Sequence, residues 1–173
     1  MEKKIGWYIE KGLLVRTPFI RKLSPKFLEK ARNNLITMNI LFEMQDKREI
    51  REALDIPREY DSAEWVVACG YYAMYMAALA ALAQVGYRSR NHSGTILALE
   101  AFFVKKELLE PKYLEMIGEA QFGMEHVEQI RWARERREIA QYSVTKHTTK
   151  RLASESRDDA YEFVERMEKL LER

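Results

Sequence analysis

The stretch Trp65–Val85, WVVACGYYAMYMAALAALAQV, carries no charged side chain and decides the fold. It is about as long as a helix that crosses a bilayer. However, it is richer in alanine, tyrosine and methionine than in leucine, isoleucine and phenylalanine, it contains Gln84, and Asp61 and Glu64 precede it. A helix that is apolar on every side also suits the centre of a helical bundle. We therefore predict a buried bundle helix that ends at Gly86, a residue suited to a helix C-terminus.

The residues on either side of this stretch predict further helices and no strand, because apolar residues recur at steps of three and four. Helices are expected over residues 1–15, from Ser24 to near Gln45, from Asn91 or Ser93 through Phe103, from Glu110-Pro111 onward, and from Ser156–Asp159 to the C-terminus. The helix that opens at Glu110-Pro111 is expected to be the longest. Four long helices joined by short connections predict an all-α, up-and-down four-helix bundle with an additional short N-terminal helix.

Polar residues and prolines set the expected helix boundaries. Ser24-Pro25 supplies an N-terminal cap followed by proline in the first turn. The stretch Asp61-Ser-Ala-Glu64 resembles a capping box, with Asp61 or Ser62 as the cap. Residues 87–91 are expected to form a basic turn, and the charged residues 46–60 a connection with at most a short helical turn.

Length and charge allow one domain whose functional charges are local. The chain has 173 residues and a formal net charge of +2, which is not the balance of a broadly basic nucleic-acid-binding domain. Its one cysteine, Cys69, cannot form an intramolecular disulfide, so we expect a reduced, cytoplasmic setting. The start MEKKIGWYIEKGLL lacks the uninterrupted apolar core of a secretory signal.

An arginine-rich stretch, Arg131–His147, RWARERREIAQYSVTKH, follows the apolar line of the helix that opens at Glu110-Pro111. Arg137 continues that line, so we expect it to face inward or toward a partner, with Arg134 and Gln141 beside it. Burying an arginine costs free energy unless an anion pairs with its guanidinium. Two interpretations remain open: a structural arginine paired with a glutamate, with Tyr142 sealing the end of the bundle, or a phosphate-binding site. The residues after Tyr142 have poor helical character, so the helix is expected to fray there.

Two segments together resemble the HEPN superfamily. They are Tyr71–Phe103, YYAMYMAALAALAQVGYRSRNHSGTILALEAFF, and Arg137–Tyr142, REIAQY. The resemblance covers about residues 25–171 and is closest to small stand-alone archaeal and bacterial members, which are often encoded beside a minimal nucleotidyltransferase. It implies a single HEPN-like domain over residues 1–173, with residues 1–20 as an N-terminal helical extension, and a bundle that forms homodimers.

The resemblance also implies a catalytic arrangement, from which the chain departs at one position. In catalytic members an arginine is followed after four to six residues by a histidine, and two such pairs meet across a dimer cleft and cleave RNA without a metal. Arg137 matches the arginine, whereas Tyr142 stands where the histidine is expected. Tyrosine, whose ordinary pKa is about 10, is a poor general base near neutral pH.

The resemblance therefore implies a toxin-like component of a toxin–antitoxin or defence module. It is a candidate metal-independent endoribonuclease with Arg137 and Tyr142 as catalytic residues and no cofactor. The alternative is a non-catalytic nucleotide- or RNA-binding module that partners a minimal nucleotidyltransferase. Tyr142 is also a candidate acceptor for adenylylation by such a partner. The residues expected to contact phosphate are Arg134, Arg137, Gln141, Arg88 and Arg90, although Arg88 and Arg90 could equally be solvated.

The remaining chemically interesting residues are expected to be structural. Packing and capping are the favoured roles of His92, with an approach to the cleft as the alternative. Tyr71, Tyr72 and Tyr75 are expected in the core with their hydroxyls at the bundle edge, and His126 on the surface. The histidines and the cysteine show no metal-ligand spacing, so we expect no metal site.

Overall fold

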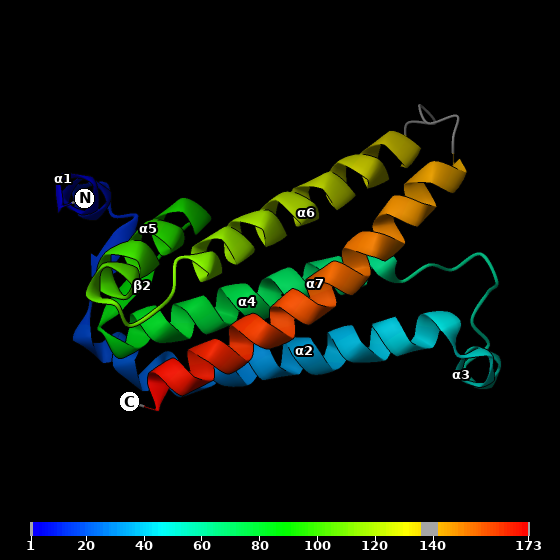
Figure 1. Ribbon diagram of the computed structural model, residues 1–173, viewed down its shortest axis with the longest axis horizontal. Coiled ribbons are helices and arrows are strands. Elements are labelled where there is room, and N and C mark those ends of the chain that lie inside the picture. Colours follow the sequence, from blue (N-terminus) through cyan, green and yellow to red (C-terminus); the bar gives the residue numbers. More distant parts are fainter. Residues whose placement is uncertain (1, 136–141, 173) are drawn as a thin grey trace.

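The computed structural model describes residues 2–135 and 142–172, with side chains at 3–45, 47–129 and 150–172. Four long helices run alternately up and down (Figure 1): α2 (Ser24–Asp46), α4 (Ala63–Gln84), α6 (Lys112–Glu135) and α7 (Tyr142–Leu171). Shorter helical elements surround them: α1 (Glu2–Glu10), η1 (Pro18–Leu23), α3 (Arg48–Ala53), α5 (His92–Phe102) and η2 (Val104–Lys106). The predicted all-α bundle with a short N-terminal helix is confirmed.

The apolar helix α4 is the centre of the bundle, as predicted. It packs against α2, α5, α6 and α7, and its inner residues are fully buried: Ala63, Val66, Val67, Tyr71, Ala73, Met74, Ala77, Ala78, Ala80, Ala81, Leu82 and Ala83. Among the described residues, α4 is the one helix long and apolar enough to cross a membrane, and 67% of its most apolar window is buried inside the bundle. The helix ends as expected before Gly86, whose φ of 85° lies in the left-handed region that favours glycine.

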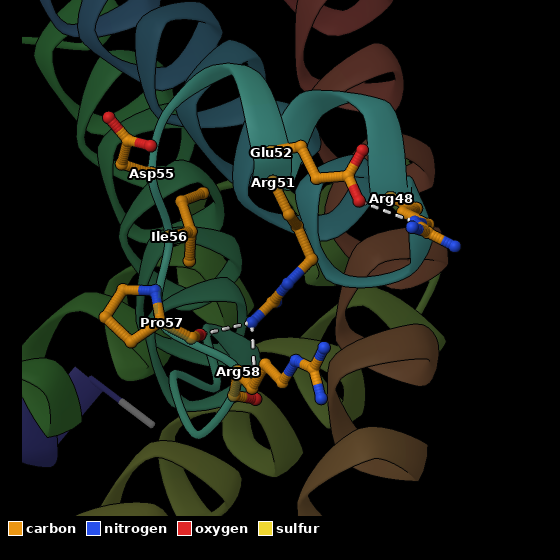
Figure 2. A pocket seen from close by; sticks show the side chains of 7 residues that line it. All are labelled: Arg48, Arg51, Glu52, Asp55, Ile56, Pro57 and Arg58. Carbon is orange, nitrogen blue, oxygen red and sulfur yellow. Dashed lines mark hydrogen bonds and ion pairs between the residues drawn. The ribbon is translucent and has the colours of Figure 1, made fainter.

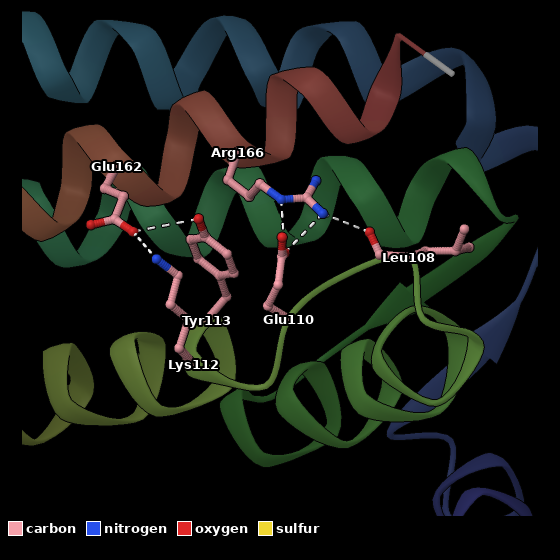
Figure 3. A network of polar contacts seen from close by, with 6 residues as sticks. All are labelled: Leu108, Glu110, Lys112, Tyr113, Glu162 and Arg166. Carbon is pink, nitrogen blue, oxygen red and sulfur yellow. Dashed lines mark hydrogen bonds and ion pairs between the residues drawn. The ribbon is translucent and has the colours of Figure 1, made fainter.

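The end of the bundle where α6 begins is fixed by polar contacts with α7 (Figure 3). The Arg166 guanidinium donates to the Glu110 carboxylate at 2.9 Å and to the Leu108 carbonyl at 2.8 Å. One turn away, Lys112 donates to Glu162 at 2.5 Å. The Arg166 guanidinium holds the pKa of the Glu110 carboxyl below its ordinary value. These contacts set the position of α6 on α7 at the end where the chain enters α6.

Two short strands correct the expectation that the chain has none. β1 (Leu14–Arg16) pairs antiparallel with β2 (Tyr87–Ser89), so that Leu14 lies opposite Ser89 and Arg16 opposite Tyr87. The predicted basic turn at residues 87–91 is therefore partly strand. Three residues are too few to show an alternating pattern, and the two partners lie far apart in the sequence, so local periodicity carries no sign of this pairing.

The last helix is also longer than predicted. α7 begins at Tyr142, not near Ser156–Asp159, and its 30 residues make it longer than the 24-residue α6. Its buried residues Ala153, Ala160 and Phe163 anchor the helix in the core. Once a helix is anchored, each further residue adds a hydrogen bond, so residues that form helices poorly still extend it.

The predicted cap at Asn91 is confirmed, the one at Asp61–Glu64 is confirmed in part, and the one at Ser24 is wrong. The Asn91 side chain accepts from the Gly94 N–H at 2.8 Å. The Asp61 carboxylate accepts from the Ala63 N–H at 2.9 Å, but the residue that directly precedes α4 is Ser62, whose side chain makes no capping hydrogen bond. Ser24 does not cap α2. It is the first residue of that helix, and its buried hydroxyl donates to the Ala80 carbonyl at 2.8 Å, which ties the start of α2 to α4.

Candidate functional site

The residues that the sequence singled out lie around the connection between α6 and α7. Arg134 is in the last turn of α6 and Tyr142 is the first residue of α7, and the structure describes only the backbone of these two. Arg137 and Gln141 lie outside the described residues. The fold thus brings Arg134 and Tyr142 to the same end of the bundle (Figure 1).

The two other predicted phosphate ligands lie at the opposite end of the bundle. Arg88 is on β2 and Arg90 follows it, and both side chains are exposed. Figure 1 shows β2 near the end where α6 begins, and the 24 residues of α6 span about 36 Å. Within one chain, Arg88 and Arg90 therefore do not extend a phosphate track from the α6–α7 connection.

A hollow at the same end as the α6–α7 connection was not predicted. It consists of two spaces of about 760 and 230 Å³ that share two lining residues, and we call it the α3 hollow. Figure 2 shows the larger space. The larger space is lined by Arg48, Arg51, Glu52, Asp55, Ile56, Pro57 and Arg58, and the smaller by Gln45, Arg51, Arg58, Tyr60, Asp61 and Lys150. Helix α3, the loop that follows it and α7 thus share one cationic surface, with Arg51 and Arg58 common to both spaces.

Arg51 organises the loop that borders the hollow. Its guanidinium donates to the Pro57 carbonyl at 2.7 Å and to the Tyr60 carbonyl at 3.1 Å. Figure 2 shows its side chain reaching from α3 to this loop. The Tyr60 N–H also donates to the Pro57 carbonyl at 3.1 Å, which closes a tight turn. Arg51 is therefore a structural residue that fixes the backbone on either side of Arg58.

The charged run at residues 46–60 was the signal that could have drawn attention to this site. Arg48 and Arg51 are three residues apart and so share a face of α3. Arg58 is placed by the turn, and Lys150 joins from a distant helix. The sequence alone does not bring these four cations together.

A second polar cluster lies in the middle of the bundle, where the Tyr71 hydroxyl forms a hydrogen bond with His92. The Tyr75 ring centroid lies 4.6 Å from that of His92. Burial lowers the pKa of the His92 imidazole below its ordinary value of 6.5, against the opposing effect of the Glu125 carboxylate. Burial also raises the pKa of the Tyr71 phenol. Both groups therefore favour their neutral forms, and the contact agrees with the expected packing role of His92.

His92 is also too far from the α6–α7 connection to replace the histidine of the family motif. It interacts electrostatically with Glu125 of α6, ten residues or about 15 Å before that helix ends at Glu135. Tyr71 is buried as expected, Tyr75 is half-buried, and Tyr72 is exposed, so the expectation of a core position is wrong for Tyr72.

The remaining histidine and acidic residues do not form a metal site in the described part of the chain. His126 is half-buried, not fully on the surface as expected. No three histidine, cysteine, aspartate or glutamate side chains converge there in a group able to hold a metal ion. Cys69 is half-buried and free, and burial raises the pKa of its thiol.

Comparison with known proteins assigns the family. A sequence profile of the HEPN domain matches residues 24–173, which include all four long helices and the α3 hollow and leave out α1, β1 and η1. No curated protein and no solved structure matches the chain. Because the match spans most of the chain and the observed fold is a four-helix bundle, the chain belongs to the HEPN family.

Proposed function

We propose that the protein is a cytoplasmic, toxin-like HEPN homodimer that acts on RNA through the residues around its α6–α7 connection. The observation that carries the proposal is the position of the Arg134–Tyr142 segment. This segment connects α6 to α7 at one end of the bundle and contains Arg134 and Arg137, and the chain belongs to the HEPN family. Guanidinium groups pair with phosphate through two parallel hydrogen bonds, which makes an RNA backbone a suitable ligand.

The proposed reaction is metal-independent cleavage of RNA. The ribose 2′-oxygen attacks the adjacent phosphorus and gives its proton to water, while the bond from phosphorus to the 5′-oxygen breaks and that oxygen takes a proton from Tyr142 or from water. Arg137 would stabilise the charge that develops on the phosphate. Tyr142 would orient the phosphate or give the proton to the leaving oxygen as a weak acid.

A dimer is supported by an exposed apolar face on α4 and α6. Trp65 is 54% exposed and Tyr72 is 45% exposed, although both belong to the central helix. With Ala68 of α4 and Met124 and Val127 of α6 they line a hollow of about 200 Å³, which Glu64 and Glu128 also border. This face lies two to three turns before Arg134, so a second copy bound here would bring the two α6–α7 connections near each other.

The replacement of the family histidine by Tyr142 favours a second candidate function. In that case the chain binds RNA or a nucleotide without cleaving it and partners a minimal nucleotidyltransferase, which could modify Tyr142. The first candidate cleaves RNA and the second does not. In both, Arg137 contacts a phosphate.

Cleavage of end-labelled RNA in excess EDTA distinguishes them. The parent protein is compared with Arg137→Ala, Tyr142→Phe and the control Arg88→Ala, whose arginine lies at the other end of the bundle. Three results together support the ribonuclease: the cut RNA carries 2′,3′-cyclic phosphate ends, a 2′-deoxy substrate is not cut, and cutting is lost in Arg137→Ala but kept in Arg88→Ala. The rate of Tyr142→Phe then shows whether the tyrosine takes part in the reaction. Binding without cutting, weakened in Arg137→Ala, supports the second candidate. Absence of both from the parent overturns the proposal.

A further inference from the structure

Arg58 is the cation of the α3 hollow that has no counter-ion among the residues the structure describes. Its neighbours are already engaged: Arg48 pairs with Glu52 at 2.6 Å, and Arg51 donates to the loop carbonyls. No described residue forms an ion pair or a hydrogen bond with the Arg58 guanidinium, although Arg51 donates to the Arg58 backbone carbonyl at 3.5 Å. Figure 2 shows its guanidinium extending away from the Pro57 carbonyl. An arginine in this position has its donors available for an external anion.

The backbone that carries Arg58 is fixed before any ligand arrives. Arg58 is the second residue of the turn closed by the hydrogen bond from the Tyr60 N–H to the Pro57 carbonyl. Arg51 binds the carbonyls on both sides of it, at Pro57 and at Tyr60. Binding an anion would therefore order the Arg58 side chain alone and not the loop, which lowers the entropic cost of binding.

The charge balance of the smaller space favours an anion. Two arginines, Arg51 and Arg58, and one carboxylate, that of Asp61, line it beside Lys150, which has an interaction of its own. That carboxylate already accepts from the Ala63 N–H at 2.9 Å, which neutralises part of its charge. In the larger space Glu52 is paired with Arg48, so Asp55 is its one carboxylate without an arginine partner.

Shape and aromatic content favour a nucleic acid strand over a single small anion. The larger space of about 760 Å³ exceeds what one phosphate fills, and it shares Arg51 and Arg58 with the smaller space, which Tyr60 also lines. The Tyr60 side chain is 38% exposed, so a face or edge of its ring is available to a base. Cations beside an exposed aromatic ring are the combination that binds single-stranded nucleic acid.

We infer that the α3 hollow binds a phosphodiester of single-stranded RNA, with Arg58 as the main phosphate ligand and Tyr60 as a stacking platform. The inference rests on the proposed function and extends it, because this site is separate from the Arg134–Tyr142 segment. Lys150 of the hollow lies eight residues, or about 12 Å along α7, from Tyr142. One RNA strand would thus be long enough to contact both the hollow and the start of α7.

The test is fluorescence anisotropy of the full-length protein with a labelled single-stranded RNA over a series of salt concentrations. Arg58→Ala should weaken RNA binding about tenfold, because it removes charge-assisted hydrogen bonds to the phosphate. Arg58→Ala should also reduce the magnitude of the slope of the log of the association constant against the log of the salt concentration by about 0.7, the value for one phosphate contact on a single strand. Arg58→Lys should restore the slope and part of the affinity, and Tyr60→Phe should bind better than Tyr60→Leu.

The matched control is Arg16→Ala, which removes an exposed arginine from β1 at the other end of the bundle and should leave binding unchanged. Unchanged binding in Arg58→Ala, with weaker binding in Arg137→Ala, overturns this inference and leaves the proposed function standing. Weaker binding in Arg58→Ala alone supports the hollow and counts against the Arg137 site. A parent protein that binds no RNA overturns both. Equal losses in Arg58→Ala and Arg16→Ala would mean attraction by overall charge and would also overturn the inference.

Discussion

The Ser156 hydroxyl lies where a side chain at Gly70 would stand, and this contact sets the distance between α4 and α7. A Cβ at residue 70 would overlap the Ser156 Oγ and would lie 3.1 Å from the Ser156 carbonyl oxygen and 3.2 Å from the Met38 sulfur. The Ser156 Oγ is itself buried with no hydrogen-bond partner. The close approach of the two helices thus depends on a missing side chain at one residue and an unsatisfied hydroxyl at the other.

Gly70→Ala is therefore expected to lower the free energy of unfolding by about 1–3 kcal/mol, because the added methyl overpacks the interface of α4 and α7. Ser156→Ala is expected to be neutral or stabilising, because it removes a buried hydroxyl that has no partner. In urea unfolding, the double variant should lose less stability than the sum of the single variants. Strict additivity would show that the two residues do not meet.

Loss of the Tyr71 hydroxyl should destabilise the bundle. Tyr71→Phe leaves His92 without its buried partner, so we expect a loss of about 1–2 kcal/mol in the free energy of unfolding. Tyr72→Phe, at an exposed position on the same helix, is the control and should change little. Equal stability of the two variants in chemical unfolding would contradict a structural role for the Tyr71–His92 contact.

His92 should make stability depend on pH on the acid side of neutrality. Burial lowers the pKa of His92 in the folded state below the ordinary value of 6.5, so the unfolded chain takes up the proton first as the pH falls. Stability is then full above pH 6.5 and declines below it. Urea unfolding at pH 7.5 and 5.5 measures the decline, and His92→Gln should reduce it. An unchanged pH dependence in His92→Gln would assign the effect to other groups.

Asp159 should have the opposite pH dependence. Burial, together with the neighbouring carboxylates of Glu119, Glu162, Asp158 and Glu155, raises its pKa above the ordinary value of 3.8. Between 3.8 and the raised pKa the folded state holds the proton more tightly than the unfolded chain, so stability falls as the pH rises through this range. Asp159→Asn should therefore unfold at a higher temperature than the parent at pH 7 and at a similar temperature below pH 3.8. Glu29→Gln, at an exposed position of α2 and not among these carboxylates, is the control.

The apolar face of α4 should decide the oligomeric state. Trp65→Glu and Tyr72→Glu place a charge in the hollow that Met124 and Val127 complete, and a buried unpaired charge opposes association. Light scattering should show a dimer for the parent and a monomer for these variants, with helical content unchanged. Phe19→Glu replaces an 81% exposed aromatic residue of η1 and should remain dimeric. A dimer that survives in Trp65→Glu and Tyr72→Glu would exclude this face.

The long helices and the core could be predicted from the sequence because their signals are local. The charge-free stretch Trp65–Val85 predicted the central helix, and Gly86 and Asn91 marked a helix end and a helix start by their own backbone and side-chain chemistry. The arginine-rich segment before Tyr142 could likewise be found by its spacing. Periodicity and capping act within one or two turns, so they can be read without knowledge of distant contacts.

Only the tertiary structure decided which distant residues meet. It paired Leu14 with Ser89, extended α7 back to Tyr142, and set Gly70 against Ser156. It also placed Arg58 and Lys150 at one hollow and moved Arg88 and Arg90 to the far end of the bundle. Such contacts depend on how whole helices pack, and helix packing is determined by the shape of a complete core and not by the spacing of residues along one segment.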